Sequence, residues 1–250
     1  MSKIIGIVSG KGGVGKTTLC ANLAFALAKR GNNVIAIDGD IGLKNLDILL
    51  GMVDKSAYDL TDVLSGRCTV AKAIQVHDSY CNLHFISASQ SSYTDELDRD
   101  ALFRLCRFLR TRYDYVLIDA PAGVGDGFHN IVSCCDECIV VATPDLTSIR
   151  DAEKTSTLLG AYPKLSAKLV LNKINKQMIA QGYLNNIDDI MDCISLPLLG
   201  LVPTDELIVV YGNGGTPVAD TKSPCANPFM NIADRLSGKD IPLDKMWYKK

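Results

Sequence analysis

Short apolar runs recur along the chain and alternate with segments of helical periodicity. The runs cover residues 4–8, 34–37, 83–86, 115–118, 138–142, 169–171 and 197–202. They are continuously apolar, which is typical of strands that are buried on both faces of a parallel sheet. After the first run, Leu19, Leu23 and Leu27 recur every fourth residue and Gly31 supplies a stop signal. A helix is therefore predicted over residues 17–30.

The alternation of strands and helices continues to the end of the chain. It predicts an α/β fold, with a doubly wound, mostly parallel sheet and helices on both faces. Folds of this kind bind their ligands in loops at the carboxyl ends of the strands. Because no repeat, low-complexity segment or linker interrupts the pattern, residues 1–238 are expected to form one domain. Residues 239–250 are expected to form a short C-terminal tail.

The composition of the chain indicates which partners and which cellular location are expected for the protein. The chain has 250 residues, 47% of them hydrophobic, and a net charge of −2, so it can bury a large core and has no overall positive field. A nucleic acid partner is therefore not expected. The N-terminal apolar run is too short for a signal peptide, and no run approaches the roughly 20 residues that span a bilayer. The expected location is the cytoplasm.

The nine cysteines are scattered and odd in number, which favours reduced thiols that pack as small apolar side chains. Cys135 and Cys138 form a C-x-x-C pair. No second pair has a comparable spacing, so we interpret these two residues as structural rather than as metal ligands.

A glycine-rich loop follows the first predicted strand and opens the first predicted helix. Gly10, Gly15, Lys16 and Thr17 match the P-loop pattern G-x-x-x-x-G-K-[ST]. In such loops successive backbone N–H groups converge on phosphate oxygens, and the helix N-terminus adds partial positive charge. Lys16 is expected to reach the β- and γ-phosphates, and the Thr17 hydroxyl to bind Mg²⁺. The residues expected to contact the phosphates are Gly10, Lys11, Gly12, Gly13, Val14, Gly15, Lys16, Thr17 and Thr18.

Carboxylates follow two other predicted strands. Asp119 ends the run of residues 115–118, as does the acid of a Walker B strand, which holds the Mg²⁺ shell. Asp38 and Asp40 follow the run of residues 34–37. Strand ends at one edge of a sheet face the same crevice, so all three are candidates for the nucleotide site. From the residues alone, Asp38 and Asp40 can also be structural acids at a strand end, Asp38 more readily than Asp40.

Lys11 lies inside the loop at a position where the general P-loop pattern requires no lysine. The string KGGVGKTT resembles the deviant Walker A loop of the ParA and MinD superfamily of ATPases. This resemblance implies an ATP-dependent homodimer in which Lys11 reaches across to the partner's phosphates, as an arginine finger does. It also implies catalytic roles for Lys11, Lys16 and Asp40, with Asp40 positioning and activating the attacking water. Asp38 is implied to be a neighbouring polar contact, and Thr17, Asp40 and Asp119 to be the Mg²⁺ site.

Four further segments are similar to the MinD family of cell-division ATPases: residues 41–47, 87–90, 119–123 and 147–152. The first and third of these resemble its switch I and switch II, where Gly42, Gly123 and Gly125 permit rearrangement. The resemblance places Asn45 and Asp151 at the dimer or partner surface. It also implies that Asn172 hydrogen-bonds the adenine and that the loop around Pro203 packs on the base, although that loop can also be an ordinary turn at a strand end.

The implied function is a Mg²⁺-dependent ATPase switch in division-site selection. ATP drives dimerisation and recruitment of partners, and hydrolysis releases them; the implied partners are a division inhibitor and an ATPase activator. Members of the MinD family usually end in a basic amphipathic helix. Here Leu243, Met246 and Trp247 could share one helical face beside several lysines. The tail is therefore either a weak peripheral contact with the inner face of the cell membrane or an inert or self-packed segment.

Three other functions differ in the residues that they require. A partition ATPase that binds DNA needs a basic patch, and the mildly acidic composition argues against it. A carrier resembling the nitrogenase iron protein needs a cysteine in switch II, and residues 119–126 contain none. A flagellar-number regulator of the MinD type is a nearer relative and stays an alternative.

Overall fold

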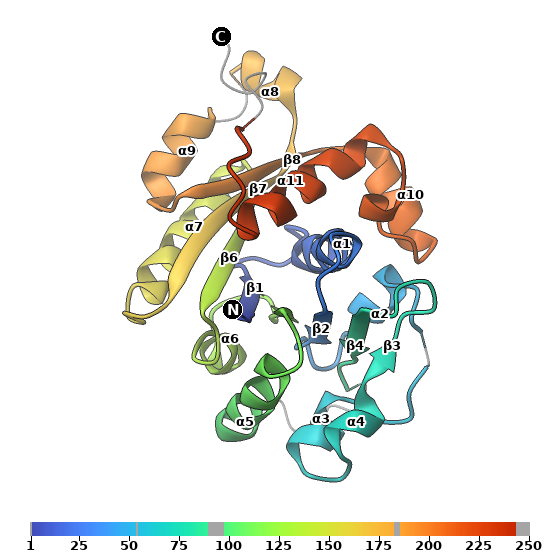
Figure 1. Ribbon diagram of the computed structural model, residues 1–250. Coiled ribbons are helices and arrows are strands. Elements are labelled where there is room, and N and C mark those ends of the chain that lie inside the picture. Colours follow the sequence, from blue (N-terminus) through green and yellow to red (C-terminus); the bar gives the residue numbers. More distant parts are fainter. Residues whose placement is uncertain (1, 54, 90–97, 183–185, 244–250) are drawn as a thin grey trace.

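The computed structural model describes residues 2–53, 55–89, 98–182 and 186–243 (Figure 1). It contains an eight-stranded sheet in the order β3-β4-β2-β5-β1-β6-β7-β8. All neighbours are parallel except β3 and β4. The strands are β1 (Lys3–Val8), β2 (Val34–Asp38), β3 (Gln75–Val76), β4 (Leu83–Ile86), β5 (Tyr115–Asp119), β6 (Glu137–Ala142), β7 (Ser166–Ile174) and β8 (Leu198–Pro203). The predicted mostly parallel α/β sheet is confirmed.

Helices cover both faces of this sheet (Figure 1). They are α1 (Lys16–Lys29), α2 (Leu46–Leu49), α3 (Leu60–Leu64), α4 (Val70–Ala73), α5 (Arg99–Arg110), α6 (Asp126–Val132), α7 (Leu146–Leu159), α8 (Lys176–Ala180), α9 (Ile187–Ile194), α10 (Glu206–Asn213) and α11 (Asn227–Leu236). One core layer contains α1, α2 and α11, and the other contains α5, α6, α7 and α9.

The alternation of side chains along β1 explains why its sequence is apolar throughout. Ile5 and Ile7 are buried in the layer of α1 and α11, whereas Ile4 and Val8 are buried in the layer of α5, α6 and α7. Successive side chains of a strand point to opposite faces of the sheet. Because helices cover both faces here, every side chain of β1 is directed into a core layer, and apolar residues are favoured at each position.

The register of the central strands brings their carboxyl ends together. Ile7 of β1 and Asp38 of β2 both lie opposite Asp119 of β5. Beyond the strand ends, the Gly39 N–H donates to the Asp119 carbonyl at 2.9 Å. The three carboxyl ends therefore form one edge, where the functional side chains gather.

The sequence pattern missed some details. Helix α1 begins at Lys16 rather than Thr17, and β7 is longer than predicted at both ends. Strand β3 was not predicted at all, because a two-residue edge strand is too short to show a period. None of the described helices is long and apolar enough to cross a membrane.

The boundary of the predicted tail stays a prediction. Its first residues are tied to α11, since the Arg235 guanidinium donates to the carbonyls of Ile241 at 2.8 Å and Pro242 at 2.9 Å. Met246 and Trp247, on which the predicted membrane contact depends, lie outside the described residues.

Candidate functional site

The phosphate loop joins β1 to α1, and two of its glycines are closely approached by residues of other elements. Gly15 has a φ of 97°, and a Cβ there would lie 2.2 Å from Nδ2 of Asn172. A Cβ on Gly10 would lie 2.5 Å from the carbonyl oxygen of Asp151 in α7. The first turn of α1 has no acidic residue and no side-chain cap. Its N–H groups thus remain free to bind an anion.

Lys16 begins α1 and is only 7% exposed. Burial lowers the pKa of its ammonium group, and the nearby Asp119 and Asp40 carboxyls oppose this shift. A cation held in a site of low dielectric interacts strongly with any anion that enters. The arrangement suits the binding of phosphate.

Asp119 and Asp38 are buried beside this lysine, each 1% exposed. Burial raises the pKa of Asp119 to about 8, although the neighbouring Thr17 hydroxyl lowers it. Its Oδ1 has no hydrogen-bond partner among the described residues. Burial also raises the pKa of Asp38 to about 6, while the backbone N–H groups of Leu46 and Asp40 donate to its carboxyl at 3.2 and 3.1 Å.

Asp40 completes the group and is half-buried. Burial raises the pKa of its carboxyl, and the Lys16 ammonium lowers it. One lysine therefore faces three carboxyls, and one buried carboxylate oxygen is unpartnered. These residues fit a divalent cation held with a phosphate, because oxygen ligands are those that Mg²⁺ prefers. Asp119 and Thr17 would hold the ion, with Asp40 at its side.

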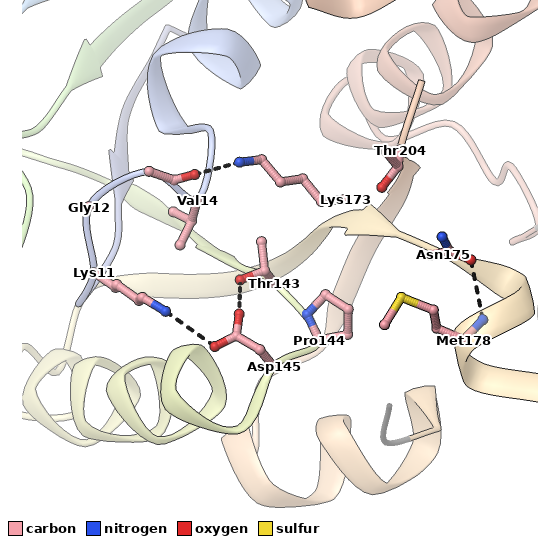
Figure 2. Close-up of a pocket in the computed structure, with 11 residues that line it drawn as sticks. Lys11, Gly12, Val14, Thr143, Pro144, Asp145, Lys173, Asn175, Met178 and Thr204 are labelled. Carbon is pink, nitrogen blue, oxygen red and sulfur yellow. Dashed lines mark hydrogen bonds and ion pairs between the residues drawn. The ribbon is translucent and has the colours of Figure 1, made fainter. Parts of the chain in front are cut away.

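The outer side of the loop is arranged differently (Figure 2). The Lys11 ammonium donates to Oδ1 of Asp145 at 3.2 Å and to Oγ1 of Thr147 at 2.8 Å. Asp145 caps α7 by accepting from the Ser148 N–H at 3.0 Å, and it accepts from the Thr143 hydroxyl at 2.6 Å. Although burial alone would raise the pKa of Asp145, these hydrogen bonds hold it well below its usual range. Lys11 is thus held within its own chain.

The end of β7 also contacts the loop. The Asn172 amide donates to the Val14 carbonyl, and the Lys173 ammonium donates to the Gly13 carbonyl, both at 2.7 Å. A cavity of about 390 Å³ lies beside these contacts. It is lined by Lys11, Gly12, Gly13, Val14, Thr143, Pro144, Asp145, Lys173, Asn175, Met178 and Thr204. Pro203 ends β8 next to this lining without being part of it.

Known proteins match the chain over almost its whole length. Residues 1–237 match a family model described as ParA: NUBPL iron-transfer P-loop NTPase. The septum site-determining protein MinD of Synechocystis sp. is 39% identical over 244 residues, which are 97% of this chain and 92% of that protein. MinD of Bacillus subtilis is 38% identical over 246 residues, again 97% and 92%. The chain belongs to the MinD family of ParA-type P-loop ATPases.

Solved structures of this family superpose closely. A chain of the MinC:MinD cell division complex of Aquifex aeolicus has a TM-score of 0.90 at 37% identity, covering 97% of this chain and 98% of that one. MinD of Pyrococcus horikoshii, complexed with Mg-ADP, has a TM-score of 0.85 at 31% identity, covering 96% and 100%. As a member of the MinD family, the protein is a Mg²⁺-dependent ATPase of division-site selection.

The segments that resemble the family's switches lie at the same edge of the sheet. Gly42 and Gly123 have positive φ values of 95° and 89°, which favour glycine. Gly125 has a φ of −79°, which any residue can adopt. Its backbone therefore gives no support to the expectation that Gly125 permits rearrangement of the switch. Asn45 is exposed before α2 and its side chain caps nothing among the described residues.

Sequence reasoning missed two residues that contact the loop, Asp145 and Lys173, and a third, Thr143, whose hydroxyl donates to Asp145. All three come at or just after the carboxyl end of β6 or β7. The rule that ligand sites lie at such ends would have marked the region, although not the individual contacts.

Cys135 and Cys138 lie under β1, since a Cβ on Gly6 would be 3.0 and 3.3 Å from their sulfur atoms. Close packing against a central strand gives both thiols a place in the core.

Proposed function

We propose that ATP bound at the phosphate loop controls self-association and partner binding. The observation that carries this proposal is the buried Asp119 carboxyl, whose Oδ1 is unpartnered among the described residues although Lys16 and Thr17 lie beside it. An unpaired buried polar group costs free energy, and a divalent cation with its phosphate would recover that cost.

The roles of the individual residues follow from their places. The Lys16 ammonium and the loop N–H groups bind the β- and γ-phosphates, and Thr17 and Asp119 hold Mg²⁺. When bound, Mg²⁺ offsets the negative charge of the terminal phosphates. Asp40 orients the attacking water and accepts its proton, and burial brings its pKa closer to neutrality, where a general base works best. Asp38 fixes Asp40 by accepting its backbone N–H.

Exposed apolar side chains at the same edge support an ATP-dependent homodimer. Leu43, Leu146, Met178 and Leu207 are 64%, 67%, 40% and 42% exposed. They follow the carboxyl ends of four different strands, β2, β6, β7 and β8. Apolar side chains of this size around one site mark an interaction surface. In the dimer, Lys11 would leave Asp145 and reach the partner's phosphates.

A protein partner is inferred from the family. The solved complex of Aquifex aeolicus contains MinC with MinD. By similarity, this protein would bind a division inhibitor of the MinC type and an activator of its ATPase. The exposed Arg150 and the half-buried Asp151 of α7 lie next to the phosphate loop, so a partner bound there could sense the nucleotide.

Membrane attachment is proposed through residues 239–250. A single short tail buries few apolar groups, whereas a dimer presents two tails and gains avidity. Attachment to the inner face of the membrane would therefore depend on ATP.

Sedimentation velocity tests the switch directly. With Mg-ATP the wild-type protein and Asp40→Ala should form dimers, and Asp40→Ala should keep them because hydrolysis is blocked. Lys11→Ala should stay monomeric while still binding Mg-ADP. Monomers of Asp40→Ala at saturating Mg-ATP would overturn the proposal. Co-sedimentation with anionic liposomes, with and without residues 241–250, tests the membrane step.

A further inference from the structure

Strand β7 is irregular near its carboxyl end, at Asn172 and Lys173. Its pairing with β8 changes register between Leu171 and Ile174, so both residues lie where the ladder is interrupted. Lys173 has a φ of 55°, an unfavourable conformation for a residue with a Cβ. Such strain persists only where surrounding contacts hold it, and it clusters at functional sites.

The side chains of this irregular segment make an ordered pair of contacts with the phosphate loop. Two consecutive side chains donate to two consecutive carbonyls of the phosphate loop, Lys173 to Gly13 and Asn172 to Val14. Figure 2 shows the Lys173 side chain extended across to the loop. These partners are separated by 160 and 158 residues along the chain.

The planarity of the peptide bond gives these contacts a consequence on the opposite side of the loop. In a trans peptide, the carbonyl of one residue and the N–H of the next point in opposite directions. Holding the Gly13 and Val14 carbonyls toward β7 therefore turns the N–H groups of Val14 and Gly15 away from it. Neither N–H donates a hydrogen bond within the described part of the chain.

We propose that Lys173 is a positioning residue for nucleotide binding. Its ammonium group holds the Gly13 carbonyl and, together with Asn172, fixes the two peptide planes that present the Val14 and Gly15 N–H groups to the phosphates. This inference rests on the proposed nucleotide site. It assigns to Lys173 a task that the P-loop pattern does not contain, because that pattern ends at Thr17.

Two simpler roles must be separated from positioning. Lys173 could merely attract the nucleotide by its charge, in which case high salt would screen the effect of removing it. It could also merely stabilise the fold, in which case its loss would lower the stability and the affinity together. A charge-matched control is available in Lys164, an exposed lysine before the other end of β7.

The experiment measures the Kd of a fluorescent ADP analogue with Mg²⁺, the kcat at saturating ATP, and thermal melting without nucleotide. The variants are Lys173→Met, Lys173→Arg, Lys173→Gly and Lys164→Met. Lys173→Gly is informative because glycine accepts a φ of 55° without strain. Its melting temperature should stay close to that of the wild type, while the contact to Gly13 is lost.

We expect Lys173→Met and Lys173→Gly to raise the Kd about ten-fold, at low salt and at high salt alike, with little change in kcat. Lys173→Arg should bind nearly as tightly as the wild type, because it can still donate, and Lys164→Met should be unchanged. Tight binding by Lys173→Met, or a loss that disappears at high salt, would overturn the positioning role. If the wild-type protein itself bound no Mg-ADP, the proposed nucleotide site would fail instead.

Discussion

On one side of the phosphate loop Lys16, Asp38 and Asp119 are 7%, 1% and 1% exposed, whereas on the other side the side chains of Lys11 and Asp145 are 41% and 44% exposed. The buried side, which we call the inner side, has one cation among three carboxyls and an unpartnered carboxylate oxygen. On the outer side, Lys11, Asp145 and Lys173 all make hydrogen bonds to neighbouring groups.

This difference follows from the dielectric environment. Charges interact strongly in the buried inner side, and their imbalance is relieved only by a ligand that brings its own charges. Contacts on the outer side are weak and screened by water, so they can be exchanged for others at little cost. We infer that the inner side determines whether nucleotide binds, and that the outer side determines what the bound state does next.

Removing the buried lysine should have the largest effect. Lys16→Met removes the buried cation from a group of three carboxyls, so it should abolish detectable Mg-ADP binding and lower ATP turnover by at least about 100-fold. Calorimetric titration with Mg-ADP and a phosphate-release assay measure both. Lys11→Met is the matched control and should still bind Mg-ADP, because Lys11 lies on the outer side. If both variants lost Mg-ADP binding equally, the inner side would not be the part of the site that determines whether nucleotide binds.

Glycine substitutions within the loop come next. Gly15→Ala adds a Cβ that would clash with the Asn172 amide and forces a side chain into a φ of 97°. It should lower the free energy of unfolding by about 3 kcal/mol. Gly13→Ala, with a φ of 77° but open space around it, should cost about 1 kcal/mol. Urea unfolding without nucleotide measures both, and adding Asn172→Ala should recover part of the loss in Gly15→Ala only.

The two sides should also respond to pH in opposite directions. Asp119 and Asp38 have raised pKa values of about 8 and about 6, so these two carboxyls bind more protons in the folded protein than in the unfolded chain: both of them between about pH 4 and pH 6, and Asp119 up to about pH 8. Their contribution to the free energy of unfolding without ligand should therefore fall as the pH rises, by up to about 1.4 kcal/mol per pH unit for each protonated carboxyl. The lowered pKa of Asp145 gives a contribution that is lost only as the pH falls below about 4.

Urea unfolding at a series of pH values checks this prediction. Asp119→Asn should flatten the slope between pH 6 and pH 8, because the amide does not titrate. Saturating Mg-ADP should reduce the same slope in the wild-type protein. A slope that Asp119→Asn leaves unchanged would show that the titrating group lies elsewhere.

The inner side could be predicted from sequence because its signals are local. Lys16 and Thr17 belong to one contiguous motif between a strand and a helix, and Asp38, Asp40 and Asp119 follow apolar runs whose ends meet at one sheet edge. The fold class follows from the same runs. The catalytic roles of Lys16, Asp40 and the other site residues stay predictions.

The outer side could not be predicted in the same way. Lys11 is 134 residues from Asp145, and Lys173 is 160 residues from Gly13, so these pairs exist only through tertiary packing. Neither Asp145 nor Lys173 belongs to a short motif. A positive φ is usually signalled by a glycine or asparagine at that position, and here the residue is a lysine. The bulge that creates it is likewise a product of how β7 meets β8.

The smallest predicted effect concerns the ion pair that holds Lys11. Asp145→Asn keeps an oxygen that can accept the Ser148 N–H and cap α7, but it removes the charge that holds Lys11 in its own chain. An exposed pair contributes at most about 1 kcal/mol, so freeing Lys11 should strengthen dimerisation with Mg-ATP about two- to five-fold. Stability should change by no more than about 0.5 kcal/mol.

Sedimentation velocity over a range of concentrations measures this change, with Asp40→Ala as the background to prevent hydrolysis. Asp98→Asn is the matched control, since Asp98 caps α5 in the same way but lies at the N-terminus of a helix that does not contact Lys11. If Asp145→Asn instead weakened dimerisation, Asp145 would be supporting the dimer rather than restraining Lys11. Equal strengthening by Asp145→Asn and Asp98→Asn would mean that the loss of a negative charge, rather than the freed lysine, is the cause.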